Sequence, residues 1–355
     1  MSNFDAKQFI DISKILKSRE FGLFLILLLV IIATTIANPR FLNAQNIRDI
    51  LLNVSIIALL TVGMTVVILM RHIDLSIGAI VGLSAFMVGE LLIKFPDMPI
   101  ILALLAGVLI GFVGGTINGL LVTLGRVPSL VATLSTLYIF RGFGYAWVSG
   151  RQITASNLSS SFSQLATDDI FGLPYLTLIA FGFMSIMAIY LRNYSGGRAF
   201  YAIGSNPDAA RLAGIAVTRT TLTGFMICGM IAGLAGVLWL ARFGTVDASA
   251  GSGLELQVVA AAVVGSVAIG GGSGTVIGAV LGALLLSVIS SSLVIMRISG
   301  FWQLAIQGGL IVSAIGLDAW LSRRLKSMTF KKAILLKESV IKDNALKNKV
   351  LKGAI

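Results

Sequence analysis

The chain has 355 residues, of which 57% are hydrophobic and only 12% are charged. Soluble domains carry roughly 25% charged residues, so this composition leaves too little polar surface to cover a water-soluble body. The net charge of +12 does not indicate nucleic acid as a partner, because ten of the 27 basic residues lie between Arg323 and Lys352 without any folded nucleic-acid-binding module. One cysteine, Cys228, and one histidine, His72, allow neither a disulfide framework nor a multi-histidine metal site. The composition predicts an all-α integral membrane protein surrounded by lipid.

The N-terminus is a basic segment, 1–20, followed by an apolar run over 21–37. Such a run could belong to a signal peptide, but no clear cleavage site with small residues follows it. Many further apolar runs come after it. We therefore expect a retained first membrane helix.

Apolar runs that are long enough to cross about 30 Å of hydrocarbon recur along the chain. We expect about ten spans, at 21–37, 47–70, 75–93, 99–124, 130–148, 173–191, 220–241, 255–269, 275–295 and 303–321. Charged or glycine-rich breaks separate the second span from the third and the eighth from the ninth. Breaks of this kind predict discontinuous helices, which are tolerated where protein or a water-filled cavity satisfies the backbone.

Basic residues predict the orientation, because they gather on the cytoplasmic side of membrane proteins. Four precede residue 21, four lie in 192–219 and ten lie in the tail 323–355. Both termini and the 192–219 segment should therefore be cytoplasmic. This gives a cytoplasmic N-terminal segment 1–20, a transmembrane domain 21–322 and a basic cytoplasmic tail 323–355.

Glycines recur at four-residue spacing in three expected helices. They are Gly107, Gly111, Gly115 and Gly119; Gly229 and Gly233; and Gly274, Gly278 and Gly282. Such stripes let two helix backbones approach closely, so the expected role is helix packing. A direct role in lining the substrate path is the alternative. The segments 62–92 and 264–294 are also alike, each with a polar break between apolar helices, as in the repeats of many transporters.

The 192–219 segment contains a short predicted helix, 206–214. Ser205 or Asn206 can cap it, Pro207 fits its first turn, Asp208 complements the helix dipole and Gly214 ends it. A helix of two turns is marginal alone in water, so it must pack on something. It either lies on its own membrane domain or docks into a cytoplasmic partner, with Asp208, Arg211 and Leu212 on one side.

Asp74 lies between two expected spans, and a carboxylate at membrane depth is a candidate for function. The alternative is structural: Asp74 or Ser76 caps the next helix, and Arg71 neutralises the carboxylate. Asp74, Ser76, Asn118 and Glu255 are our candidates for a substrate pathway. Glu90 and Glu255 could instead reach the membrane interface from span ends. The polar stretch 242–253 either lines an outer mouth or is only a linker.

No phosphate-binding loop of the G-x-x-x-x-G-K-[ST] type occurs, and no nucleophile, base and orienting group can be assembled. The chain is therefore not expected to be an enzyme. Two classes of transporter remain: a subunit of an importer driven by a separate ATPase, and an ion-coupled transporter or channel that works alone with Asp74.

The sequence resembles the permease family of ribose-type ABC importers. The residues that carry the resemblance are 73–78, 197–215, 251–256, 260–265 and 270–274, and it covers about 21–322. The chain departs from the ribose pattern at Arg71 and His72, where two glycines are usual. Together with 132–134, Arg141-Gly142 and 296–298, this makes it more similar to the autoinducer-2 and rhamnose permeases of that family.

The resemblance implies a permease in the bacterial cytoplasmic membrane that forms a homodimer or heterodimer. It implies two further partners, a cytoplasmic ATP-binding subunit and an extracytoplasmic solute-binding protein. ATP would be used by that subunit, so this chain would need no cofactor. The helix at 205–215 would be the coupling element, through Asn206, Pro207, Asp208, Arg211, Leu212 and Gly214. The expected cargo is a small sugar-like solute: autoinducer-2, rhamnose, or another pentose or hexose.

Overall fold

The computed structural model describes residues 19–300 and scattered positions between 302 and 316. The chain divides into two compact units, Met1–Gly308 and Gly309–Ile355. The fold below is that of the first unit. The expected tail 323–355 lies outside the described residues, as does most of the segment 1–20.

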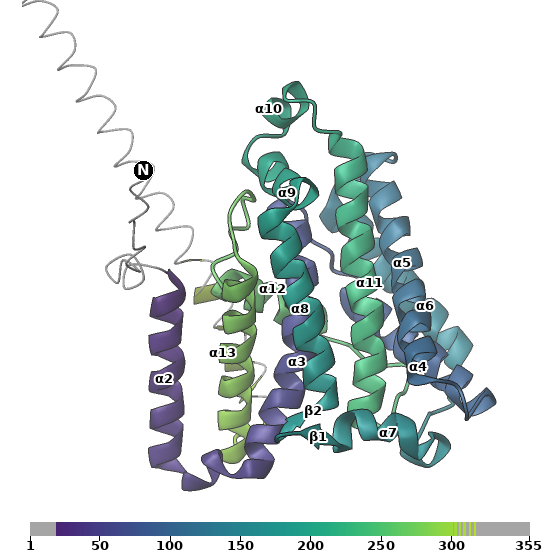
Figure 1. Cartoon of the computed structure of the whole chain (residues 1–355), viewed down its shortest axis with the longest axis vertical. Helices are drawn as coiled ribbons and strands as arrows, with labels where there is room; N and C mark the ends of the chain where they lie inside the picture. The colour runs from purple at the N-terminus through teal and green to yellow at the C-terminus, as the bar shows by residue number, and fades with distance from the viewer. Residues whose placement is uncertain are drawn as a thin grey trace, which may run out of the picture. The chain divides into compact units, whose positions relative to one another are not determined.

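Helices make up most of the described chain (Figure 1). The helices of 18 residues or more are α2 (Arg19–Ala37), α3 (Ala44–Leu69), α4 (Ile77–Lys94), α5 (Ile100–Thr123), α6 (Ser129–Val148), α8 (Tyr175–Asn193), α11 (Val217–Phe243) and α13 (Val276–Ile295). The shorter ones are η1 (Pro39–Leu42), η2 (Ala155–Asn157), α7 (Ser160–Thr167), α9 (Ser195–Ser205), α10 (Pro207–Leu212) and α12 (Leu254–Val264). The strands β1 (Asp169–Ile170) and β2 (Leu173–Pro174) form one antiparallel hairpin. An all-α membrane fold is confirmed.

Each of the first nine expected spans coincides with a helix, from α2 to α13. Seven helices in the described part of the chain are long and apolar enough to cross a membrane: α2, α3, α4, α5, α8, α11 and α13. The expected span at 130–148 forms the helix α6, which is not among these seven. The expected span at 255–269 is wrong at its end, because α12 stops at Val264 and has only 11 residues. At 1.5 Å per residue, α12 is roughly 16 Å long, too short to cross alone. The tenth expected span, 303–321, falls largely outside the described residues.

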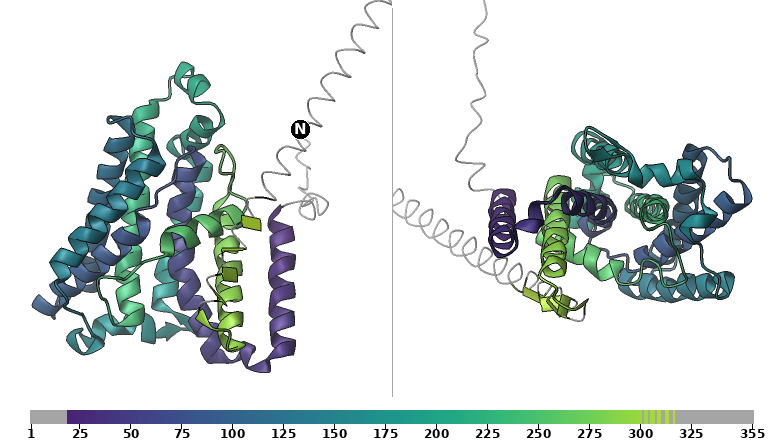
Figure 2. Two further views of the ribbon diagram at one scale, coloured as in Figure 1. Left: turned by 180° about the vertical axis from the view of Figure 1, so that it is seen from behind. Right: turned by 90° about the horizontal axis from the view of Figure 1, so that it is seen from below.

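The core of the unit is formed around α3 and α11, which are buried over most of their length. Seen from below, α11 stands among the other helices (Figure 2). Helix α2 lies at one edge beside α13, where Thr34 Oγ1 donates a 2.9 Å hydrogen bond to Ser292 Oγ. Large apolar side chains cover the outward faces of α2 and α5, as expected for helices that face lipid.

The stretch between α6 and α8 contains the hairpin and the helix α7, neither of which the apolar pattern predicted. Arg48 at the start of α3 forms a 2.9 Å salt bridge with Asp169. The hydrogen bond from Arg48, with a second one from the Gly172 N–H, holds the pKa of Asp169 below its usual value. This pairing fastens the hairpin to α3.

The glycine stripes lie where helix backbones meet. A Cβ at Gly111 would overlap the carbonyl oxygen of Gly229, and a Cβ at Gly233 would overlap that of Gly107. Gly115 meets Phe225 in the same way. Helices α5 and α11 therefore pack backbone to backbone along one seam, which we call the glycine seam.

A second contact of this kind joins α12 to α13. Gly278 packs against the carbonyl of Gly265, and Gly282 packs against that of Ala261. The expectation for Gly274 is wrong: this residue precedes α13, has φ +150° and packs on Val267 in the break. Four-residue spacing alone could not separate the last residue of a break from the first turn of a helix.

Candidate coupling and transport site

Helix α10 stands at the tip of the unit beyond α9 and α11 (Figure 1). The Asn206 side chain caps it by accepting hydrogen bonds from the N–H groups of Asp208 and Ala209, at 3.0 and 3.1 Å. Pro207 takes the first position, and Gly214 has φ +83° just after the end. Asn206 rather than Ser205 is therefore the cap.

The side chains of α10 point away from the rest of the chain. Leu212 is 91% exposed, and the Asp208 and Arg211 side chains, which lie 3.7 Å apart, are 88% and 68% exposed. Only Ala210 is buried. An exposed leucine beside an ion pair is suited to a partner groove, because burying one leucine contributes about 1.5–3 kcal/mol.

Helix α9 was not predicted, because the sequence indicated only the short helix 206–214 in this segment. Gly197 packs against the backbone of Tyr190 and Leu191, where only glycine fits. Phe200 and Ile203 of α9 are buried in the core. The 192–219 segment is therefore a two-helix element, with α9 anchored and α10 exposed.

Three segments meet where α9 ends: the break after α3, the link from α9 to α10, and the break between α12 and α13. We call this place the junction. Arg71, after α3, donates from Nε to the Gly204 carbonyl at 2.5 Å and from Nη2 to the Ser205 carbonyl at 2.7 Å. The N–H of Gly272 donates to the Leu69 carbonyl at 2.9 Å. The two breaks that made 62–92 and 264–294 alike therefore lie against each other and against the residues that lead into α10.

The expectation that Arg71 neutralises Asp74 is wrong. Arg71 has φ +67° and turns its guanidinium toward the end of α9. It forms no salt bridge with a described acidic side chain. An Arg–Asp pair three residues apart requires a helical turn, and the backbone here is not helical.

Asp74 lies instead in a fully buried polar cluster. Its Oδ1 accepts hydrogen bonds from the Ser76 N–H at 2.9 Å and the Ser76 hydroxyl at 2.7 Å. Asn118 Nδ2 donates to both carboxylate oxygens, at 3.3 and 3.2 Å, and to Ser76 Oγ at 2.7 Å. Thr136 donates to Asn118 Oδ1 at 2.6 Å. The cluster therefore ties the break before α4 to α5 and α6.

Three of the four pathway candidates meet in this cluster, and Glu255 does not. Sequence reasoning missed Thr136. The one sign of its role was that it lies three residues after Thr133, on the same face of α6. Thr133 donates at 3.2 Å to the Ile73 carbonyl.

Glu255 lies in the first turn of α12, where the chain returns into the protein. Its Oε1 accepts a 3.2 Å hydrogen bond from the Gly253 N–H, while the buried Oε2 has no hydrogen-bond partner. The small residues Gly78 and Gly82 of α4 make room for the segment before α12, whose carbonyls at Ala250 and Gly251 lie against them. Ala250 and Gly251 of the polar stretch 242–253 therefore pack against α4, while Asp247, Ser249 and Ser252 of the same stretch are exposed.

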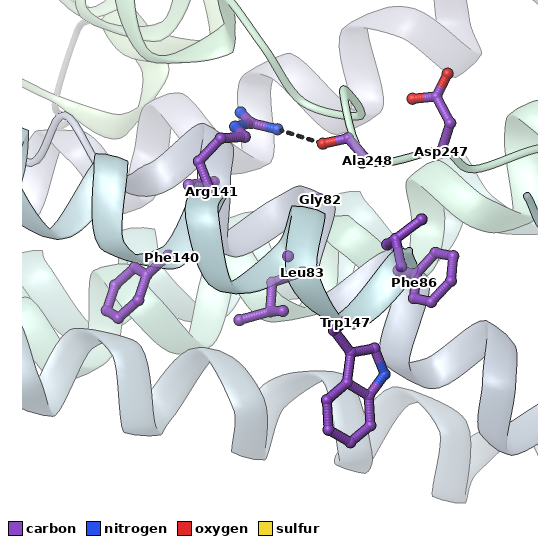
Figure 3. Close-up of a pocket in the computed structure, with 11 residues that line it drawn as sticks. Gly82, Leu83, Phe86, Phe140, Arg141, Trp147, Asp247 and Ala248 are labelled. Atoms are coloured by element: carbon purple, nitrogen blue, oxygen red, sulfur yellow. Dashed lines mark hydrogen bonds between the residues drawn. The ribbon is translucent and has the colours of Figure 1, made fainter. Parts of the chain in front are cut away.

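A small cleft opens beside this stretch, between α4 and α6 (Figure 3). Its volume is ≈ 10 Å³, about the space of one water molecule. Phe86, Phe140 and Trp147 form its apolar side. On its polar side, Arg141 donates to the carbonyls of Ala250 at 2.6 Å and Ala248 at 3.4 Å, and Asp247 lies next to them. The cleft combines an aromatic wall with a few polar groups, but in this structure it is too small to enclose a sugar-sized solute.

No group of three or more histidine, cysteine or acidic side chains that could hold a metal ion occurs among the described residues. Long apolar helices, with paired breaks that lie against each other, are typical of a membrane transport protein.

Comparison with known proteins gives the family. Residues 46–315 match the model of the branched-chain amino acid transport system / permease component. The chain belongs to this permease family, and it is a multi-pass protein of the bacterial inner membrane.

The individual proteins most similar in sequence include permeases of import systems. The chain is 38% identical over 311 residues to the autoinducer 2 import system permease protein LsrC of Enterobacter sp. (strain 638), covering 88% of this chain and 90% of that protein. It is 35% identical over 300 residues to the ribose import permease protein RbsC of Bacillus subtilis (strain 168), covering 84% and 92%. LsrC of Escherichia coli (strain SMS-3-5 / SECEC) is 33% identical over 301 residues, covering 85% and 87%. No solved structure matches. The expected membership in the ribose-type ABC importer permeases is confirmed.

Proposed function

We propose that this chain is the transmembrane subunit of an ATP-driven importer for a small sugar-like solute, with autoinducer-2 as the first candidate. The relatives named for autoinducer-2 and ribose import support this cargo class. The aromatic and polar cleft beside Arg141 is where such a solute would first contact the permease. Asp74, Ser76, Asn118 and Glu255 are retained as pathway candidates.

The observation that carries the proposal is the exposed helix α10. This chain has no phosphate-binding loop of its own, so a separate ATP-binding subunit must deliver the energy. Leu212 offers an apolar anchor, and Asp208 and Arg211 set its register in a partner groove. The junction then connects α10 to the breaks after α3 and α12. A second permease and an extracytoplasmic solute-binding protein complete the assembly.

The test replaces the Leu212 anchor and measures whether the ATP-binding subunit still binds the permease. In the double variant Leu212→Asp/Arg211→Glu, we expect the ATP-binding subunit to be lost from co-purification and solute-stimulated ATP hydrolysis in nanodiscs to fall to background. One buried leucine alone contributes about 1.5–3 kcal/mol, which is a factor of roughly ten to a hundred in affinity. Retention of both properties would refute α10 as the coupling element.

A matched control is available at the other end of the spans. Leu42→Asp/Arg40→Glu makes the same charge change on η1, where Leu42 is 53% exposed. This variant should keep the ATP-binding subunit. Labelling of Ser205→Cys in a Cys228→Ser background should require permeabilised cells, since α10 must face the cytoplasm; labelling in intact cells would reverse the orientation.

A further inference from the structure

A large cleft lies between the C-terminal end of α8, the helix α9 and the first turn of α13. Its empty volume is ≈ 1670 Å³ including the open mouth. It is distinct from the cleft beside Arg141 and from α10. Both α8 and α13 are long and apolar enough to cross a membrane, and the cleft lies at an end of each of them, so we expect it near the membrane surface.

The lining of the cleft is divided by polarity. Arg192, Arg198 and Tyr201 are on its polar side, while Ile189 and Ile277 are on its apolar side. Ile189 and Ile277 belong to α8 and α13, and both are exposed. A ligand that fills this cleft therefore has a polar end and an apolar end, which is the chemistry of a lipid.

The charge of the polar end is positive. Arg192 forms no salt bridge with any acidic side chain among the described residues. Arg198 donates from Nη1 to the Asn193 carbonyl at 2.9 Å. The other guanidinium nitrogens of Arg198 form no hydrogen bond with the described residues, so they can donate to a ligand. Among the described residues, the one acidic group that a hydrogen bond joins to the lining is Glu20, whose Oε1 accepts a 3.3 Å hydrogen bond from Thr275. Two arginines against one carboxylate leave a net positive site.

We propose that this cleft binds an anionic phospholipid, with the phosphate between Arg192 and Arg198 and the acyl chains along Ile189 and Ile277. Basic pockets between membrane helices hold anionic headgroups in this way. Guanidinium groups suit a phosphate because they present several donors in a fixed plane. The positive end of the α13 dipole adds to the attraction. The site adjoins α9, so the lipid would steady the helix that leads into α10.

The test uses the full chain, purified in a neutral detergent, and measures phosphatidylglycerol binding by native mass spectrometry. The wild-type chain should bind phosphatidylglycerol in preference to phosphatidylcholine. In Arg192→Gln/Arg198→Gln we expect binding to weaken about 30-fold, the loss of about 1 kcal/mol for each charge. Arg192→Lys/Arg198→Lys keeps the charges and should recover most of the binding.

The control double variant Arg126→Gln/Arg219→Gln removes the same charge from exposed arginines outside the cleft, and it should bind as the wild type does. Thermal unfolding in detergent without lipid shows that each variant is folded. Equal phosphatidylglycerol binding by the cleft variant and the control would overturn the proposal. Displacement of the lipid by inorganic phosphate at roughly 10 mM would also overturn the proposal, because the site would then be one for a free anion.

Discussion

The glycine seam and the junction are both places where glycine lets backbones touch, yet they are built in opposite ways. In the glycine seam two continuous helices, α5 and α11, meet over several turns, and Gly107, Gly111 and Gly233 each face a backbone. At the junction the helices are interrupted. The Arg71 guanidinium makes two hydrogen bonds across the breaks and the Gly272 N–H makes one, and Gly204 lies against the Leu69 carbonyl.

The difference shows which region can move. A seam of interlocked backbones cannot slide without overlap, because packed interiors are bistable rather than continuously deformable. A break held by a few hydrogen bonds can exchange partners at a cost of a few kcal/mol. We therefore expect the glycine seam to stay fixed during transport. We expect the hydrogen bonds of the junction to change when α10 moves with the ATP-binding subunit.

The largest expected effect is at the glycine seam. In Gly111→Ala the new Cβ would overlap the Gly229 carbonyl, so the helices must separate. We expect a loss of about 3 kcal/mol or more of unfolding free energy, seen as a lower thermal midpoint or failed expression. Gly182→Ala on α8 is the matched control, since nothing lies within 4 Å of that position, and it should be neutral or stabilising by up to about 1 kcal/mol. Equal stability of the two variants would contradict the rigid seam.

The next effect is at the junction and concerns transport more than stability. Arg71→Gly suits the backbone at φ +67° but removes the two hydrogen bonds to the end of α9. We expect solute-stimulated ATP hydrolysis to fall about tenfold, because coupling energies between sites are typically 1–3 kcal/mol. The thermal midpoint should change little.

Arg126→Gly is its matched control. Arg126 is also an arginine with positive φ, at +53°, in the turn between α5 and α6. This variant should leave the coupled hydrolysis unchanged. Equal loss in both variants would show that the backbone conformation matters rather than the Arg71 contacts.

The smallest effect on transport is expected at Asp74. In Asp74→Asn the amide oxygen can still accept from Ser76, but its NH₂ group then faces the Asn118 Nδ2 donor. One lost hydrogen bond should cost about 1–3 kcal/mol of unfolding free energy. Uptake should stay within a few-fold of the wild type, measured in cells at matched expression. Abolished uptake by a folded variant would assign a transport role to the carboxylate.

Much of this architecture could be predicted from the sequence, because apolar runs and their breaks are local signals. The span positions and the capped helix at Asn206 follow from residue type and order alone. Other features depend on contacts between distant segments. They are the direction of the Arg71 side chain, the packing of the 242–253 stretch on α4, and the hydrogen bond between Thr136 and Asn118. Helix α9 was missed because three of its eleven residues are glycine, which is a poor helix former. Two of these glycines are required by distant contacts, since Gly197 packs on the backbone of α8 and Gly204 on the Leu69 carbonyl.

The most direct test of the account is uptake into proteoliposomes that contain the permease, its ATP-binding subunit and its solute-binding protein. We predict uptake of radiolabelled autoinducer-2 or ribose that requires ATP inside the vesicles and is unaffected by a protonophore, for the wild type and for Asp74→Asn. Uptake by the permease alone, driven by a proton gradient and lost in Asp74→Asn, would contradict the account.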